Sequence, residues 1–97
     1  SRSEDGLREV QKEVQSKGSS CEIFIGDVSE EAFANEVVTQ AIQKFGKIDI
    51  MINNAGYGIF KAAEHITVEE WDSMFATNTK GTFLFCKAVI PHMKERK

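Results

Sequence analysis

The sequence lacks the features of a membrane-spanning or polyanion-binding protein. No apolar run approaches the ~20 residues that a transmembrane helix needs. Its 12 Lys and Arg residues are dispersed and are outnumbered by 15 Asp and Glu residues, which gives a formal net charge of −3. Nucleic acid and anionic lipid surfaces attract basic stripes, and none is present. We therefore expect neither a nucleic-acid partner nor a membrane partner.

Cysteine and histidine are also scarce. Cys21 and Cys86 form no C-x-x-C pair, and there is no pair of histidines at helical spacing. His65 and His92 have no partner at the spacing of metal ligands or of a catalytic triad. This pattern predicts no metal site, two buried and reduced thiols, two histidines on the solvated surface, and a cytoplasmic protein.

Helical and strand-like segments alternate along the chain. Capping residues and apolar spacing predict helices over about residues 4–17, from Ser29 to Gly46, and from Thr67 onward. Apolar runs rich in β-branched and aromatic residues predict strands over residues 21–26 and 48–52. This order predicts an α/β fold with a parallel sheet and right-handed crossovers.

Two strands alone do not make a stable sheet. Strands that are covered on both faces need neighbours for their backbone groups, and a 97-residue chain that begins and ends in helical sequence does not supply them. We therefore expect residues 1–97 to be a central fragment of one larger domain.

The last predicted helix carries a polar residue on an apolar seam. That seam consists of Trp71, Phe75, Phe85, Val89 and Met93. Asn78 falls on the same face, and Pro91 should kink or end the helix. Leaving a buried amide unpaired costs about 1–3 kcal/mol. Asn78 is therefore expected to be buried, either bonded to a backbone carbonyl or acting as a site residue that opens the helix and holds a water.

Polar residues follow both predicted strands. Asn53-Asn54-Ala55-Gly56 comes after residues 48–52, and Asp27 comes after residues 21–26. In open α/β sheets, ligands bind outside the carboxyl ends of the strands, so two polar strand ends predict one ligand crevice. The alternative is purely local: Asn and Gly are common turn residues, and Asp27 could merely begin the next helix.

Four elements of the sequence together resemble the short-chain dehydrogenases/reductases. They are, in order, Gly26-Asp27-Val28, Asn53-Asn54-Ala55-Gly56, Trp71, and Asn78-Thr79-Lys80-Gly81. The resemblance covers essentially the whole chain and is nearest to the 3-oxoacyl-[acyl-carrier-protein] reductase type. It implies a Rossmann-like, doubly wound parallel sheet in which the two strands present here are not neighbours. It also implies a homo-oligomeric, dimeric or tetrameric, NAD(P)-dependent oxidoreductase acting on small carbonyl or alcohol substrates such as 3-oxoacyl thioesters.

The resemblance assigns most of the expected cofactor contacts to the two strand ends. Asp27 would accept a hydrogen bond from the adenine amino group, beside the backbone of Val28. Asn53, Ala55 and Gly56 would bring backbone close to the cofactor ribose.

The remaining roles fall on Asn54, Asn78 and Arg2. Asn54 would brace the sheet, and the backbone carbonyl of Asn78 would hold a water in the catalytic proton relay. Arg2 would pair with the 2′-phosphate of NADP, which favours NADP over NAD because a guanidinium suits a phosphate. The alternative for Arg2 is an ordinary solvated arginine.

Two further elements that the resemblance leads us to expect are absent from residues 1–97. They are the glycine-rich turn that cradles the pyrophosphate and the segment with the catalytic serine, tyrosine and lysine, so the isolated fragment should be inactive. Tyr57 and Lys61 match the pattern Y-x-x-x-K, but they follow a strand end in a glycine-containing loop. That pattern works on one face of a helix, so we do not interpret this copy as catalytic.

Two rival interpretations remain at this stage. One is a non-catalytic, flavodoxin-like α/β binding module, although a receiver domain would need an acidic residue where Asn53 and Asn54 stand. The other is a member of the same family that has lost catalysis.

Overall fold

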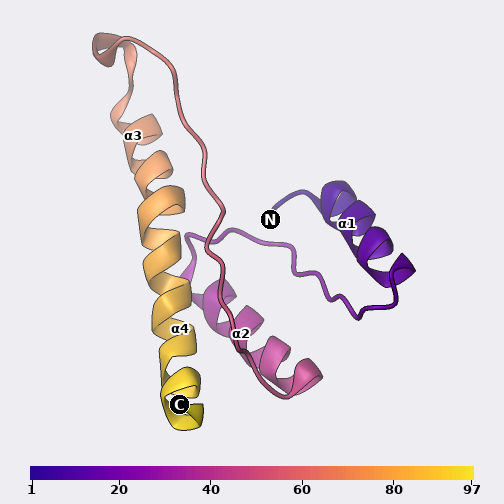
Figure 1. Ribbon diagram of the computed structural model, residues 1–97. Coiled ribbons are helices and arrows are strands. Elements are labelled where there is room, and N and C mark those ends of the chain that lie inside the picture. Colours follow the sequence, from indigo (N-terminus) through magenta and orange to yellow (C-terminus); the bar gives the residue numbers. More distant parts are fainter.

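The computed structural model describes residues 1–97 as helices joined by extended chain (Figure 1). In order, the elements are α1 (Glu4–Ser16), α2 (Glu31–Phe45), the 3₁₀ turn η1 (Ala63–His65), α3 (Val68–Phe75), the π-helical turn η2 (Ala76–Lys80) and α4 (Gly81–Arg96). α3, η2 and α4 follow one another without a break and form one long rod, against which α2 packs. None of these helices is both long and apolar enough to cross a bilayer.

The helix boundaries follow local signals. Gly46 ends α2 in the left-handed conformation, with φ of 83°, which glycine adopts without steric cost. Thr67 and Glu70 form the predicted capping box at the start of α3. Ser29, predicted to cap α2, lies one residue too early because Glu30 occupies the cap position and the Ser29 hydroxyl bonds to Asp27 instead.

The rod corrects one half of the prediction about proline. Pro91 lies inside α4 and does not end it, because the helix continues to Arg96, and the predicted kink stays a prediction. A proline removes one backbone hydrogen bond, but the turns on both sides of it remain helical here. The expected seam is half right, because Phe85 and Val89 are buried whereas Trp71 and Phe75 are exposed.

The predicted strands are extended chain without a ladder. Residues 21–26 and 48–52 have no strand assignment, and no backbone hydrogen bond joins one segment to the other. The missing ladder has a physical cause: a strand exists only through pairing, and the one backbone-to-backbone hydrogen bond that either segment makes runs from the Gly26 amide to the Ser1 carbonyl. The expectation that these two segments do not pair with each other agrees with the structure.

A small core lies between α2 and α4. Its buried side chains are Ala34 and Val38 on α2 and Leu84, Phe85 and Val89 on α4. Phe33 packs edge-to-face against Phe85, with ring centroids 6.3 Å apart. Only 6 of the 97 residues are buried, and the radius of gyration is 15.7 Å against roughly 13 Å for a compact chain of this length. The extended segments therefore lie over the helices without being enclosed.

Candidate functional site

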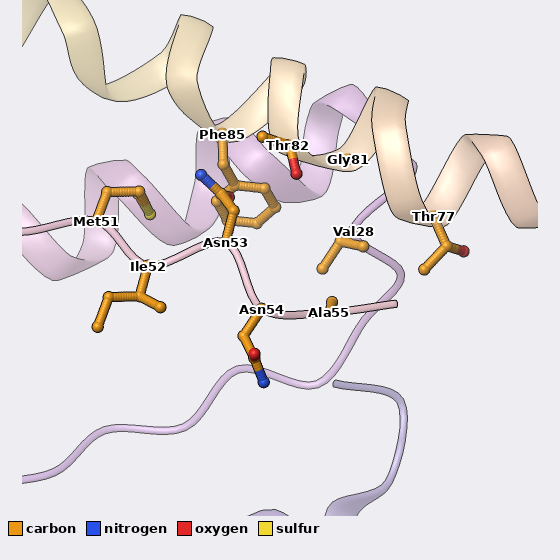
Figure 2. A pocket seen from close by; sticks show the side chains of 10 residues that line it. All are labelled: Val28, Met51, Ile52, Asn53, Asn54, Ala55, Thr77, Gly81, Thr82 and Phe85. Carbon is orange, nitrogen blue, oxygen red and sulfur yellow. The ribbon is translucent and has the colours of Figure 1, made fainter. Parts of the chain in front are cut away.

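The two extended segments meet at the amino end of α4. Val28 lies against Gly81, where a Cβ atom would come within 2.9 Å of the valine side chain and 3.2 Å of its carbonyl oxygen. A helical glycine costs roughly 1 kcal/mol relative to alanine, and here it permits this close approach. Together with residues 51–55, these two residues line a small pocket of about 120 Å³ (Figure 2).

A larger cavity adjoins this pocket and brings together most of the predicted site residues. It measures about 490 Å³ and is lined by Ser1, Arg2, Gly26, Asp27, Val28, Asn54, Ala55, Gly56, Tyr57 and Thr77. The Gly26 amide donates to the Ser1 carbonyl at 2.9 Å, which holds Arg2 beside this segment. The two polar strand ends of the sequence therefore face one crevice, as their positions predicted.

Asp27 is an anionic acceptor held in a tight turn. Its Oδ1 accepts from the Ser29 amide at 2.9 Å and from the Ser29 hydroxyl at 2.7 Å, which leaves Oδ2 without an intramolecular donor. These bonds, the backbone amide first, hold the pKa of Asp27 below its ordinary value, and the positive charge of Arg2 acts in the same direction. The carboxylate is therefore ionised at neutral pH.

Asn53 and Asn54 point in opposite directions from the extended chain. Figure 2 shows the Asn53 side chain directed toward α4 and the Asn54 side chain directed away from it. The Asn53 amide nitrogen lies 3.6 Å from the Sγ of Cys86 on α4. Extended chain alternates its side chains in this way, so only one asparagine of the pair can contact the rod.

Asn78 connects the rod to the residue that follows Gly56. Its Oδ1 accepts from the Tyr57 amide at 2.9 Å, and its Nδ2 donates to the Tyr57 carbonyl at 2.7 Å. The residue is nevertheless exposed, so the predicted burial of Asn78 is wrong. The reason is that the extended chain covers only one side of η2, and nothing else packs over this turn.

The α-helical hydrogen-bond pattern is interrupted at Asn78. Asn78 lies in the middle of η2, where the Gly81 amide bonds to the Ala76 carbonyl five residues earlier. Single π-helical turns of this kind occur frequently at functional sites. Gly56 also lies against Asn78, because a Cβ atom at Gly56 would stand 3.0 Å from the asparagine Oδ1.

Tyr57 and Lys61 do not act as a pair. They lie in irregular chain, and the Lys61 ammonium bonds to the Glu70 carboxylate at 2.7 Å and 2.9 Å. This agrees with the decision not to interpret Y-x-x-x-K as catalytic here.

The cysteines and one histidine differ from expectation. Both thiols are free, but both are half-buried rather than buried. His65 is exposed as predicted, whereas His92 is half-buried and accepts a hydrogen bond from the Ile48 amide. The sequence did not predict the hydrogen bond between Ile48 and His92, because that contact has no local pattern. It also did not predict the small pocket beside Gly81, whose only signal is a glycine inside a helix. No three His, Cys, Asp or Glu side chains come together as a set that could hold a metal ion.

Comparison with known proteins identifies the family. The family model for short chain dehydrogenases matches residues 1–97. The chain belongs to this family. An oxidoreductase of uncharacterised function from Bacillus subtilis is 41% identical over 88 residues, which cover 90% of this chain and 31% of that protein. A sepiapterin reductase from Chlorobaculum tepidum is 31% identical and matches 99% of this chain and 39% of its own length.

Solved structures of the family share the fold. A metagenomic short-chain oxidoreductase in complex with NADP superimposes with a TM-score of 0.92 at 29% identity, covering 99% of this chain and 44% of that one. A 3-ketoacyl-ACP reductase from Sinorhizobium meliloti gives a TM-score of 0.90 at 32% identity, covering 98% of this chain and 38% of that one. These likenesses support the Rossmann-like fold class, while the parallel sheet stays a prediction.

The matched region is only part of each relative. The chain spans 31% to 40% of the length of the first three curated relatives that it matches. Family membership is therefore shown for residues 1–97, and the activity of the whole protein is a matter for proposal.

Proposed function

We propose that residues 1–97 are the central part of one NAD(P)-binding domain in an NADP-dependent short-chain oxidoreductase. The intact protein would transfer a hydride between nicotinamide and a carbonyl or alcohol substrate. The observation that carries this proposal is the single cavity that Arg2, Asp27 and Gly56 line together. It combines a guanidinium, a carboxylate and closely approaching backbone, which are the groups that a phosphorylated adenosine needs.

The residues fit NADP in detail. The free Oδ2 of Asp27 would accept from the adenine amino group beside the Val28 backbone, and Arg2 would pair with the 2′-phosphate. Asn53, Ala55 and Gly56 would border the ribose, where the lack of a side chain at Gly56 lets backbone approach closely. When bound, the cofactor supplies or accepts the hydride. NAD is the alternative cofactor, and it would leave Arg2 without a phosphate to pair with.

Asn78 is the residue that we assign to catalysis. Its carboxamide is bonded to both backbone groups of Tyr57, which leaves its own backbone to act in the opened turn of η2. We propose that its carbonyl holds a water in a proton relay whose other members lie outside residues 1–97. Asn54 would then brace the sheet of the intact domain, since its side chain points away from α4 (Figure 2).

Exposed apolar side chains on α3 and α4 support a homo-oligomer. They are Val68, Trp71, Phe75, Phe83 and Ile90. The rings of Trp71 and Phe75 lie against each other with centroids 4.5 Å apart. Contiguous exposed apolar patches mark interaction surfaces, and we propose that the rod pairs with its copy in a dimer or tetramer. Two free thiols suit a cytoplasmic location.

The test is a reductase assay of the intact protein. We expect NADPH oxidation with small carbonyl compounds, among them a 3-oxoacyl thioester, and a weaker reaction with NADH. The isolated residues 1–97 should be inactive in the same assay. Cofactor binding by the intact protein without turnover of any carbonyl or alcohol would instead identify a non-catalytic family member. Absence of binding to either nucleotide would overturn the proposal.

A further inference from the structure

A backbone amide at the start of the second extended segment is held by an imidazole. The Ile48 amide donates to the Nε2 of His92 at 3.1 Å, across 44 residues of sequence, and both residues are half-buried. Nε2 accepts only when the ring is neutral and carries its hydrogen on Nδ1. An amide that is bonded to a side chain in this way is not available to a sheet ladder.

This contact is the first of a series between the rod and the extended segment. The pairs, in order along the segment, are Ile48 with His92, Asp49 with Arg96, Asn53 with Cys86, and Tyr57 with Asn78. From Asp49 onward, the partners move toward the amino end of the rod as the segment advances toward Gly56, and Figure 1 shows the segment running alongside the helices. Contacts at several heights on one rigid helix fix the register of an extended chain.

We infer that His92 is a positioning residue for the candidate cofactor site. By accepting from Ile48, the neutral imidazole sets where the segment begins on α4, and hence where Asn53 to Gly56 lie five to eight residues later. Protonation puts hydrogen on both ring nitrogens and removes the acceptor. The hydrogen bond from the Ile48 amide is therefore lost when His92 becomes charged.

The charged groups near this end of the segment are already engaged. Asp49 is ion-paired with Arg96 at 3.0 Å and with Lys47 at 3.3 Å. Lys44, at the end of α2, is directed to Glu22 at 3.7 Å. Glu95, the one carboxylate on α4 itself, lies three residues after His92 and is in no ion pair, so it is the charged group that would face a proton on the ring.

The direct test is nuclear magnetic resonance of the intact, isotope-labelled protein. Ring ¹⁵N shifts of the neutral ring should show His92 with its hydrogen on Nδ1, and the Ile48 amide resonance should shift strongly in His92→Leu, which removes the acceptor. His65, which lies exposed in η1 beside Glu64, supplies the control: His65→Leu should leave the Ile48 amide resonance where it is. An Ile48 amide resonance that is the same in the wild type and in His92→Leu would overturn the inference.

A second test uses variants, and it rests on the proposed function. His92→Gln keeps an acceptor for the Ile48 amide, so NADP affinity should stay within about twofold of the wild type. His92→Leu leaves the Ile48 amide unpaired and should weaken NADP binding roughly tenfold at all pH values. His65→Gln should match the wild type. Equal loss in the Gln and Leu variants would contradict positioning by an acceptor.

The two tests fail independently. If the intact protein binds no NADP, the proposed function fails, while the Ile48 amide resonance of the variants still decides the role of His92. If His92→Leu does not fold, the ring tautomer of the wild type and the Ile48 amide resonance of His92→Gln still decide it.

Discussion

The helices and the extended segments of this chain are held in place by different means. On the rod, Val89 is 2% exposed, and the backbone is held by the helix's own hydrogen bonds apart from the one that Pro91 removes. In the second extended segment, Ile50 and Ile52 are 78% and 80% exposed, and the chain is fastened mainly by side chains that reach it from the rod. The residues proposed to contact the cofactor thus lie in the extended segments, whose position depends on contacts with the rod.

This difference has an energetic side. Burying a Val, Leu or Phe side chain contributes roughly 1.5–3 kcal/mol, and α2 and α4 gain that contribution from the larger members of their small core. Ile50 and Ile52 contribute almost none of it while they face solvent. Neighbouring strands in an intact domain would supply that burial, and the difference between the two regions would then disappear.

The largest expected effect comes from removing the two hydrogen bonds between the Asn78 side chain and the Tyr57 backbone. Asn78→Leu keeps the backbone carbonyl but removes both side-chain hydrogen bonds to Tyr57 that hold the turn of η2 against the extended chain, so in the intact protein we expect the proposed relay water to be displaced and kcat to fall about 100-fold. NADP binding should change only severalfold. Steady-state kinetics together with direct cofactor titration separate the two effects. Equal losses in turnover and in binding would point to a folding defect and not to a relay role.

Asn78→Asp provides the matched comparison. It keeps an oxygen that can accept from the Tyr57 amide but loses the donor to the Tyr57 carbonyl. Its turnover should lie between those of the wild type and Asn78→Leu. Turnover equal to wild type would show that the second bond is dispensable.

The next effect concerns the chemistry at the first extended segment. Arg2→Asp places an acid where we propose the 2′-phosphate binds, so NADP affinity should fall roughly tenfold or more while NAD affinity is spared. Arg8→Asp is the control, because Arg8 lies on α1 and bonds only to Glu4 and Gln11. Measuring kcat/KM with both nucleotides gives the preference ratio. An NADP-to-NAD preference ratio that Arg2→Asp leaves unchanged would contradict the assignment of Arg2 to the 2′-phosphate.

A pair of truncations compares the two regions directly. In the intact protein, Val89→Ala should lower the free energy of unfolding by about 2 kcal/mol, because Val89 is already buried between α2 and α4. Ile52→Ala should cost about as much or more if neighbouring strands cover Ile52, and nearly nothing if it stays as exposed as it is here. Denaturant unfolding measures both. A negligible cost at Ile52 beside a large one at Val89 would contradict the predicted sheet.

The sequence predicted the helices well because their signals are local. The capping box at Thr67 and the stop at Gly46 were read from spacing alone, and both are confirmed. Family membership was also predictable, because motifs such as Asn53-Asn54-Ala55-Gly56 and their order along the chain can be recognised without knowledge of the fold. The crevice between Asp27 and Gly56 followed from the positions of two strand ends.

What the sequence did not predict depends on distant parts of the chain. The burial of Asn78 was wrong because an apolar seam does not say whether anything covers it. The bond from Ile48 to His92 joins residues 44 positions apart and has no periodic signal. The strands remain untested as a sheet, because pairing is decided by neighbouring strands, and a single backbone-to-backbone hydrogen bond, from Gly26 to Ser1, is all that these two segments make.

The smallest expected effect lies at the start of α3, where the extended chain becomes the rod. The Thr67 hydroxyl accepts from the Glu70 amide, and the Glu70 carboxylate accepts from the Thr67 amide, each at 3.1 Å. Thr67→Ala removes half of this reciprocal cap and should lower the free energy of unfolding by about 1 kcal/mol. Thr67→Ser keeps the hydroxyl and should lose only a few tenths. A loss in Ser as large as that in Ala would show that packing of the threonine methyl matters more than the cap.

The same cap should have a measurable pH dependence. The hydrogen bond from Lys61, followed by that from the Thr67 amide, holds the pKa of Glu70 below its ordinary value. Because the folded state binds this proton more weakly than the unfolded state, the contribution of Glu70 is fully present above the ordinary pKa and is lost as the pH falls through the lower, folded pKa. Glu70→Gln should therefore be less stable than the wild type at neutral pH and should converge with it in acid. Glu69→Gln, one residue away and without these bonds, should show no such convergence. A stability difference for Glu70→Gln that stays constant from neutral pH into acid would mean that the carboxylate charge contributes nothing and that only the hydrogen-bond geometry of the cap does.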